Sequence, residues 1–179
     1  DYLFGGENVI IELKIIETEF LHENTMKKRV QKAFDEYPDI DPGDHSKPLR
    51  RELLNIFRNP LQRIFKKANS QIKSTKKHTE RQDSLGIVIF INDRFKAPPP
   101  GLVIDLLDEL LQGPSYGSVD AFVYVTNHYV EIYGSEYAHL LWTARYNKTA
   151  PERLVEFIDA LGTDWHNYCE KVIGPFDIS

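Results

Sequence analysis

The sequence predicts a mixed α/β fold, in which helices flank one central β-sheet. Three observations favour this class: a hairpin pattern at the start of the chain, helical periodicity in residues 47–79, and a continuous apolar run at residues 85–92. Such a run is typical of a central strand that is covered on both faces. The whole order is hairpin, helices, buried strand, helix, three strands and a last helix, which is typical of a layered α/β sandwich.

The chain of 179 residues is long enough to bury a core of its own, so we expect one domain over residues 1–179. Its single cysteine, Cys169, excludes an intrachain disulfide and favours a reducing compartment, so we expect a cytoplasmic location. The longest apolar runs, such as residues 87–91, are far too short to span a bilayer, so we expect no membrane partner.

Residues 1–17 predict a β-hairpin, with strands at 1–4 and 9–17 and a tight turn at 5–8. The turn begins with two glycines, and the flanking Val, Ile and Phe residues favour strands. An acid and a base lie side by side between isoleucines on the second strand, because side chains alternate along a strand. One face has Val9, Ile11, Leu13 and Ile15, and the other has Ile10, Glu12, Lys14 and Ile16.

The same hairpin brings Asp1 back towards Glu12, so that two carboxylates and Lys14 converge at one end of a small sheet. Mg²⁺ prefers oxygen ligands and is usually held by one or two carboxylates, which leaves positions for water and phosphate oxygens. A nearby lysine can orient a water or balance charge that develops on a phosphate. The hairpin therefore predicts a site for a hard divalent cation, Mg²⁺ or Mn²⁺.

This pattern, Asp1 followed after ten residues by Glu12-Leu13-Lys14, resembles the core motif of the PD-(D/E)XK, or restriction-endonuclease-like, phosphodiesterase superfamily. The resemblance implies a mixed sheet with flanking helices and the two parts of the motif on adjacent strands. It implies that Asp1 and Glu12 are metal ligands, with the Leu13 carbonyl as a further one. Lys14 would position or activate the attacking water, so Asp1, Glu12 and Lys14 are the expected catalytic residues.

The chain departs from the family pattern at its beginning. The family usually has a helix and a strand before the Asp, often with another acid on that helix, whereas here Asp1 is the first residue and is not preceded by Met. We therefore expect a restriction-endonuclease-like domain that lacks its N-terminal helix and strand. The alternative for the motif itself is an ordinary hairpin with an exposed Glu–Lys pair on one strand face.

Basic residues are concentrated in residues 26–81, which have a net charge of +8, while the rest of the chain has a net charge of −13. In this block we expect helices at 18–37 and 47–79. Pro60 indicates either two helices or one helix kinked at Asn59 in the second segment. A basic block beside a metal site suits a polyanion such as nucleic acid.

Basic side chains in the second half of the 47–79 segment fall on the face away from its apolar stripe. They are candidate contacts to a nucleic-acid backbone, and the alternative is an ordinary solvated helix surface. The candidates are Arg63, Lys66, Lys67, Lys73 and Lys77, and Lys76 and Arg81 widen the patch. Some nucleases of the superfamily have a helical Gln-x-x-x-Tyr; Gln71 is followed by Thr75 at the fourth position, so the motif is not matched and Gln71 has low weight.

The C-terminal half alternates strands and helices. Asn127-His128 is interpreted as a two-residue hairpin connection, and Gly162 as a break in the last helix. The predicted elements are a strand at 85–92, a helix at 102–111, strands at 119–126, 129–133 and 139–146, and a helix from Pro151 with a second part at 165–172.

The sequence thus predicts a metal-dependent nucleic-acid phosphodiesterase, in first place a DNA endonuclease that hydrolyses phosphodiester bonds. DNA is the expected partner, and a homodimer is compatible with this interpretation. Two alternatives stay open. One is a non-catalytic module on the same fold that binds nucleic acid or protein, and the other is an ordinary α/β interaction domain without metal chemistry.

Overall fold

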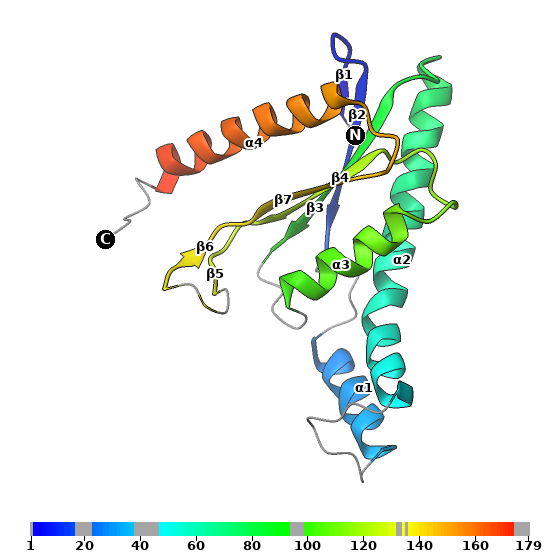
Figure 1. The fold of residues 1–179 in the computed structure, drawn as a ribbon, viewed down its shortest axis with the longest axis vertical. Helices are drawn as coiled ribbons and strands as arrows, with labels where there is room; N and C mark the ends of the chain where they lie inside the picture. The colour runs from blue at the N-terminus through cyan, green and yellow to red at the C-terminus, as the bar shows by residue number, and fades with distance from the viewer. Residues whose placement is uncertain are drawn as a thin grey trace.

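The computed structural model describes residues 2–16, 23–37, 47–93, 99–131, 134 and 136–173, and it has the predicted mixture of helices and strands (Figure 1). In chain order the elements are β1 (Tyr2–Phe4), β2 (Val9–Ile15), α1 (Glu23–Asp35), α2 (Lys47–His78), β3 (Leu85–Asn92), α3 (Pro100–Leu111), β4 (Ala121–Thr126), β5 (Val130–Glu131), β6 (Ala138–His139), β7 (Trp142–Tyr146) and α4 (Glu152–Ile173).

A five-stranded mixed sheet forms the centre of the molecule, with the strand order β1-β2-β3-β4-β7. β1 and β2 are the predicted antiparallel hairpin, and β2, β3 and β4 run parallel. β7 closes the other edge in antiparallel orientation. Parallel neighbours need a crossover; α1 and α2 lie between β2 and β3 in the chain, and α3 lies between β3 and β4. The predicted mixed α/β class is confirmed.

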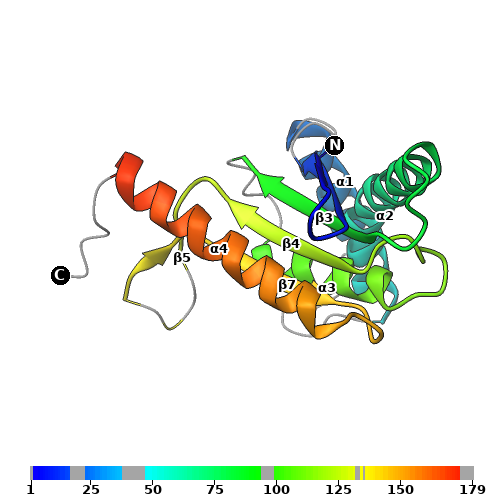
Figure 2. The ribbon, with the colours of Figure 1, turned by 90° about the horizontal axis from the view of Figure 1, so that it is seen from above.

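Each face of the sheet has its own hydrophobic core, because strand side chains alternate. Val88 and Phe90 of β3 pack in the core that includes buried side chains of α2 and α3. Ile87 and Ile89 pack in the second core, which includes Leu154 of α4. Figure 2 shows α4 lying across the strands on the side away from α2. The predicted strand 85–92 is therefore covered on both faces, as expected.

α2 continues through Pro60 as a single helix. Of the two predicted alternatives, the division into two helices is therefore wrong, and one helix that includes Asn59 and Pro60 is what forms. Proline inside a helix removes one backbone hydrogen bond and costs about 3 kcal/mol. The apolar stripe on both sides of it, with Ile56 before and Leu61 and Ile64 after, is buried in one core. Each such side chain contributes about 1.5–3 kcal/mol when fully buried, which offsets the cost of the proline.

The N-terminal helix is shorter than its predicted range where the structure describes it. α1 (Glu23–Asp35) falls within the predicted segment 18–37 and ends two residues before the predicted C-terminal end. Residues 17–22, and the predicted loop residues 38–46, lie outside the described residues. In the part of the chain that the structure describes, none of the helices combines the length and apolar character needed to cross a membrane.

The predicted hairpin around Asn127-His128 is wrong. β4 pairs with β7, whereas β5 pairs with β6 in a separate two-stranded ribbon. The predicted strand 139–146 is accordingly divided into β6 and β7. Burial explains the choice of partner: β7 places Trp142 and Ala144 against the core under α4, whereas β5 offers only a partly buried Val130.

Gly162 does not break the last helix, since α4 is continuous from Glu152 to Ile173. A Cβ atom at Gly162 would lie 2.7 Å from Nε1 of Trp142, closer than real Cβ contacts allow. The glycine therefore lets α4 pack directly on the indole of β7. Trp165, one turn later, packs on the same indole, with ring centroids 5.5 Å apart.

Candidate functional site

The face of β2 that packs against α2 contains the predicted acid and base. The Nζ atom of Lys14 donates to Oε1 of Glu12 over 2.5 Å and to Oε1 of Gln71 over 2.6 Å. Gln71 belongs to α2, so the three side chains link the strand to the helix. We call Glu12, Lys14 and Gln71 the Glu12 site. It lies between Ile10 and Ile16, which are both fully buried.

Glu12 is only 3% exposed, and its second carboxylate oxygen is unusual. Oε2 is buried and has no hydrogen-bond partner among the described residues. A buried charged group without a partner is costly, and most buried polar atoms in folded proteins are paired. This oxygen is therefore able to accept a further partner, such as a hydrogen-bond donor or a bound ion.

The burial of this pair excludes the alternative of an exposed Glu–Lys pair. The side chains of Glu12 and Lys14 are 4% and 10% exposed. Their depth results from the sheet: Glu12 lies opposite Val88 and Lys14 opposite Phe90, and both neighbours are buried. The strand therefore holds an ion pair inside the core beneath α2.

Gln71 belongs to the site, although the incomplete match to Gln-x-x-x-Tyr argued against it. The expected tyrosine is absent at Thr75, but a hydrogen bond to Lys14 does not depend on that residue. Gln71 directly precedes Ile72, which is buried in the apolar stripe of α2. A polar residue at the edge of a buried stripe faces a neighbouring element, and this signal could have identified it.

The other two predicted metal ligands are Asp1 and the Leu13 carbonyl. Asp1 lies outside the described residues, so its role stays a prediction; β1 begins one residue later, where Tyr2 pairs with Ile11, the neighbour of Glu12. The side chain of Leu13 lies on the opposite strand face and is 36% exposed. Over the described ranges, no three Asp, Glu, His or Cys residues gather as a metal-binding group.

The five predicted nucleic-acid contacts on α2, Arg63, Lys66, Lys67, Lys73 and Lys77, are all exposed. They do not all face the Glu12 site. At about 100° per residue, Lys67 and Arg63 lie within about 80° of Gln71 around the helix axis, and Lys77 lies about 120° away. Lys66 and Lys73 lie about 140° and 160° from Gln71, on the other side of the helix.

The two residues expected to widen this basic patch have other roles. Lys76 is buried, and its Nζ atom lies 3.9 Å from Oδ2 of Asp120. Arg81 donates to the carbonyl oxygen of Gly5 in the hairpin turn, 3.2 Å away. Lys76 is therefore part of the protein interior, and Arg81 ties the end of α2 to the hairpin.

The pair of Asp120 and Lys76 is a second acid–lysine pair between the sheet and α2. Oδ2 of Asp120 also accepts from the backbone N–H of Gly86, 2.8 Å away, and Oδ1 lies 3.4 Å from the donating amide of Asn147. Both oxygens of this carboxylate thus have partners. A Cβ atom at Gly86 would lie 2.1 Å from the carbonyl oxygen of Ser118, so only glycine fits this close approach.

An uncharged polar pair lies further along the same sheet face. The side-chain amide of Asn92 donates to the hydroxyl oxygen of Tyr124 over 2.7 Å, and both residues are buried. Burial raises the pKa of Tyr124 above its ordinary value of 10.0, and the hydrogen bond from Asn92 lowers it in part. The hydroxyl is therefore neutral at physiological pH.

Neither protein-family models, nor curated proteins, nor solved structures give a match to this chain.

Proposed function

We propose that this protein is a metal-dependent nuclease that hydrolyses phosphodiester bonds of DNA, on a restriction-endonuclease-like fold. One observation supports this most strongly: the buried carboxylate of Glu12 has one oxygen held by Lys14 and the other without a partner among the described residues. A divalent cation such as Mg²⁺ or Mn²⁺ fits such an oxygen, because it prefers carboxylate ligands and offsets the cost of burying the charge.

Glu12, Asp1 and the Leu13 carbonyl are the proposed ligands of this ion. When bound, the ion supplies Lewis-acid polarisation of a phosphate oxygen and lowers the pKa of a coordinated water. The protein contributes the fixed position of the carboxylate, which is set by the β2–β3 ladder and by Lys14.

The ammonium of Lys14 can donate a third hydrogen bond. A lysine ammonium has three N–H donors, and two of them are used for Glu12 and Gln71. The third is available to orient the attacking water or to balance negative charge on the phosphate. Gln71 would act through Lys14, by holding its ammonium in place.

The cations of α2 supply attraction to the nucleic-acid backbone. A homodimer and a cytoplasmic location also stay predictions.

Cleavage assays test the proposal. Purified protein is incubated with supercoiled plasmid, linear duplex and single-stranded DNA in Mg²⁺ or Mn²⁺. Cleavage by the wild type is expected, and Glu12→Gln and Lys14→Ala are each expected to abolish it at a temperature at which circular dichroism shows that both variants are folded. Glu7→Gln, which removes an exposed acid in the hairpin turn, is the matched control and should cut normally.

Two results would contradict the proposal. Cleavage that is unchanged in Glu12→Gln would show that the Glu12 site is not the catalytic centre. Binding of DNA by the wild type without cleavage in any metal or substrate would instead favour the non-catalytic module on the same fold.

A further inference from the structure

A row of polar side chains follows one ridge of α2. Residues four apart on a helix form a continuous ridge that is inclined to its axis. In α2 this row consists of Asn55, Asn59, Arg63, Lys67 and Gln71. Its two ends are sixteen positions apart, which corresponds to about 24 Å at 1.5 Å per residue. One end of the ridge is the Glu12 site, because Gln71 contacts Lys14 there.

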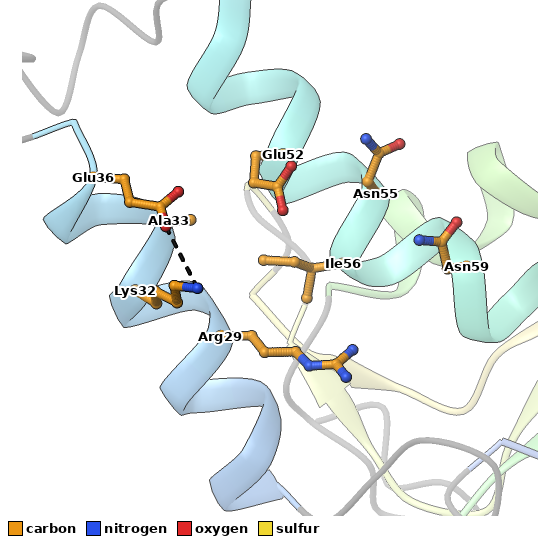
Figure 3. A pocket seen from close by; sticks show the side chains of 8 residues that line it. All are labelled: Arg29, Lys32, Ala33, Glu36, Glu52, Asn55, Ile56 and Asn59. Carbon is orange, nitrogen blue, oxygen red and sulfur yellow. Dashed lines mark ion pairs between the residues drawn. The ribbon is translucent and has the colours of Figure 1, made fainter.

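The other end of the ridge is a cavity between α1 and α2, with a volume of about 370 Å³. Figure 3 shows the Arg29 side chain extending from α1 towards α2, where Asn55, Ile56 and Asn59 lie. Glu52 lines the same cavity, as do Lys32 and Glu36. The ridge therefore runs from the Glu12 site to the cavity along a single helix. It turns by about 40° with each step of four residues, and so by about 160° around the helix axis between Gln71 and Asn55.

Hydrogen-bonding groups of the cavity are open to a ligand. Over the described part of the chain, the structure gives no hydrogen bond or ion pair to the side chains of Arg29, Asn55 and Asn59. Lys32 pairs with Glu36, 3.5 Å apart, so these two charges offset each other. The remaining charges, Arg29 and Glu52, are also of opposite sign. Amide donors and acceptors in a cavity without net charge suit a neutral, flat, hydrogen-bonding group more than a phosphate.

Between the two ends, the ridge is cationic. Arg63 and Lys67 are exposed, and they occupy the two positions between the cavity and Gln71. Cations of this kind contact backbone phosphates without regard to sequence. The order along the helix is thus a cavity for a base, then two phosphate contacts, and then the buried carboxylate.

We propose that a single nucleic-acid strand lies along this ridge, with one unstacked base in the α1–α2 cavity and the backbone over Arg63 and Lys67 towards the Glu12 site. The inference rests on the proposed function, for which it names a single-stranded substrate. Bases of single strands can be splayed out and bound at their hydrogen-bonding edges, whereas bases in a duplex are stacked and paired. Asparagine and glutamate are suitable partners for the edges of adenine and cytosine.

Fluorescence anisotropy tests the backbone contact, with the full chain and a 5′-fluorescein single-stranded DNA of 20 nucleotides of mixed sequence in EDTA. We expect Arg63→Gln to weaken binding about tenfold and to reduce the slope of log K against log salt by about 0.7, the loss of one phosphate contact on a single strand. Arg153→Gln on α4 is the matched control, because Arg153 is exposed on the opposite side of the sheet, and it should bind normally.

Binding of a base in the cavity predicts a different result from the loss of a phosphate contact. Asn59→Leu removes an amide without changing charge, so we expect weaker binding with an unchanged salt slope. Gln62→Leu is the matched control, since Gln62 is an exposed amide on α2 outside the ridge, and it should bind like the wild type. Melting temperatures establish that each variant is folded, and Asn59→Ala replaces Asn59→Leu if the latter unfolds.

The outcomes separate this inference from the proposed function, because binding in EDTA requires no catalysis. If the wild type fails to bind the single strand, or if the ridge and control variants lose affinity equally, the inference is wrong even when the protein cleaves DNA. Tighter binding of a blunt 20-base-pair duplex than of the single strand would also overturn it. A loss of affinity in the ridge variants alone supports the inference, even if the protein cleaves no DNA.

Discussion

The two acid–lysine pairs that lie against α2 differ in how completely their carboxylates are paired. Both oxygens of Asp120 have partners: the Gly86 N–H and Lys76 for one, and Asn147 for the other. Glu12 has Lys14 on one oxygen and no described partner on the other. Both pairs lie against α2, but the side chain of Glu12 is 4% exposed and that of Asp120 is 19% exposed.

The difference indicates which pair belongs to the framework of the fold. A fully paired carboxylate is satisfied by the chain itself, and removing it would leave other groups unpaired. An incompletely paired buried carboxylate costs stability, and perturbed or unsatisfied ionisable groups are concentrated at functional sites. Asp120 therefore connects β3, the start of β4 and α2, whereas Glu12 is available to a ligand.

The largest expected difference is in metal binding. Glu12→Gln should weaken Mn²⁺ binding by more than about 100-fold, because changing even the partners of metal ligands costs about 10–100-fold. Asp120→Asn should leave Mn²⁺ affinity within about threefold of the wild type, since its carboxylate is already paired. Isothermal titration calorimetry measures both. Equal losses of Mn²⁺ affinity in the two variants would contradict the assignment of Glu12, rather than Asp120, as the metal ligand.

Stability should show the opposite order. Asp120→Asn leaves the buried Lys76 without its charged partner, and we expect it to lower the free energy of unfolding by about 2–3 kcal/mol. Glu12→Gln also leaves a largely buried lysine, Lys14, without its charged partner. It removes at the same time the cost of a buried carboxylate oxygen that has no described partner, so the net loss of free energy should be smaller, less than about 1 kcal/mol. Urea unfolding in EDTA measures both values. A larger loss in Glu12→Gln would assign Glu12 to the framework.

Gln71 should matter for rate more than for stability. Gln71→Leu removes one acceptor from the Lys14 ammonium, and we expect the cleavage rate to fall about tenfold, or about 1.4 kcal/mol in the barrier. Gln71→Glu keeps an acceptor oxygen and should restore part of the rate, which a purely structural role would not predict. Asn69→Leu is the control on the same helix, because Asn69 bonds the Ser118 N–H instead. It should lower stability but not the rate per folded molecule.

The smallest expected effect concerns the uncharged pair of Asn92 and Tyr124. The folded protein binds the Tyr124 proton more tightly than the unfolded chain, because burial raises its pKa. The contribution of Tyr124 to stability is therefore constant between pH 7 and 9, and it falls as the pH rises past the unfolded pKa of about 10.

The difference in unfolding free energy between wild type and Tyr124→Phe should be constant up to pH 9 and change by less than about 1 kcal/mol at pH 10.5. Urea titrations at several pH values measure it. A change already near neutral pH would mean that another charged group depends on this pair.

Much of the framework could be predicted from the sequence. The glycines of the turn and the alternating pattern predict the hairpin, and the apolar run predicts β3 as a strand that is covered on both faces. Alternation alone places Glu12 and Lys14 on one face. These features depend on neighbours within a few residues, so they can be recognised without knowing what packs against them.

Only the tertiary structure decided how this hairpin is used. It brings Gln71 to Lys14 across 57 positions of the chain, pairs β4 with β7, and keeps α4 continuous where Gly162 meets Trp142. It also buries Glu12 while its neighbours Leu13 and Ile15 remain 36% and 44% exposed, the reverse of their hydrophobicity. Periodicity fixes which residues share a face, but burial depends on which element covers that face. Here α2 covers the polar face of β2, and the end of the apolar face is left open.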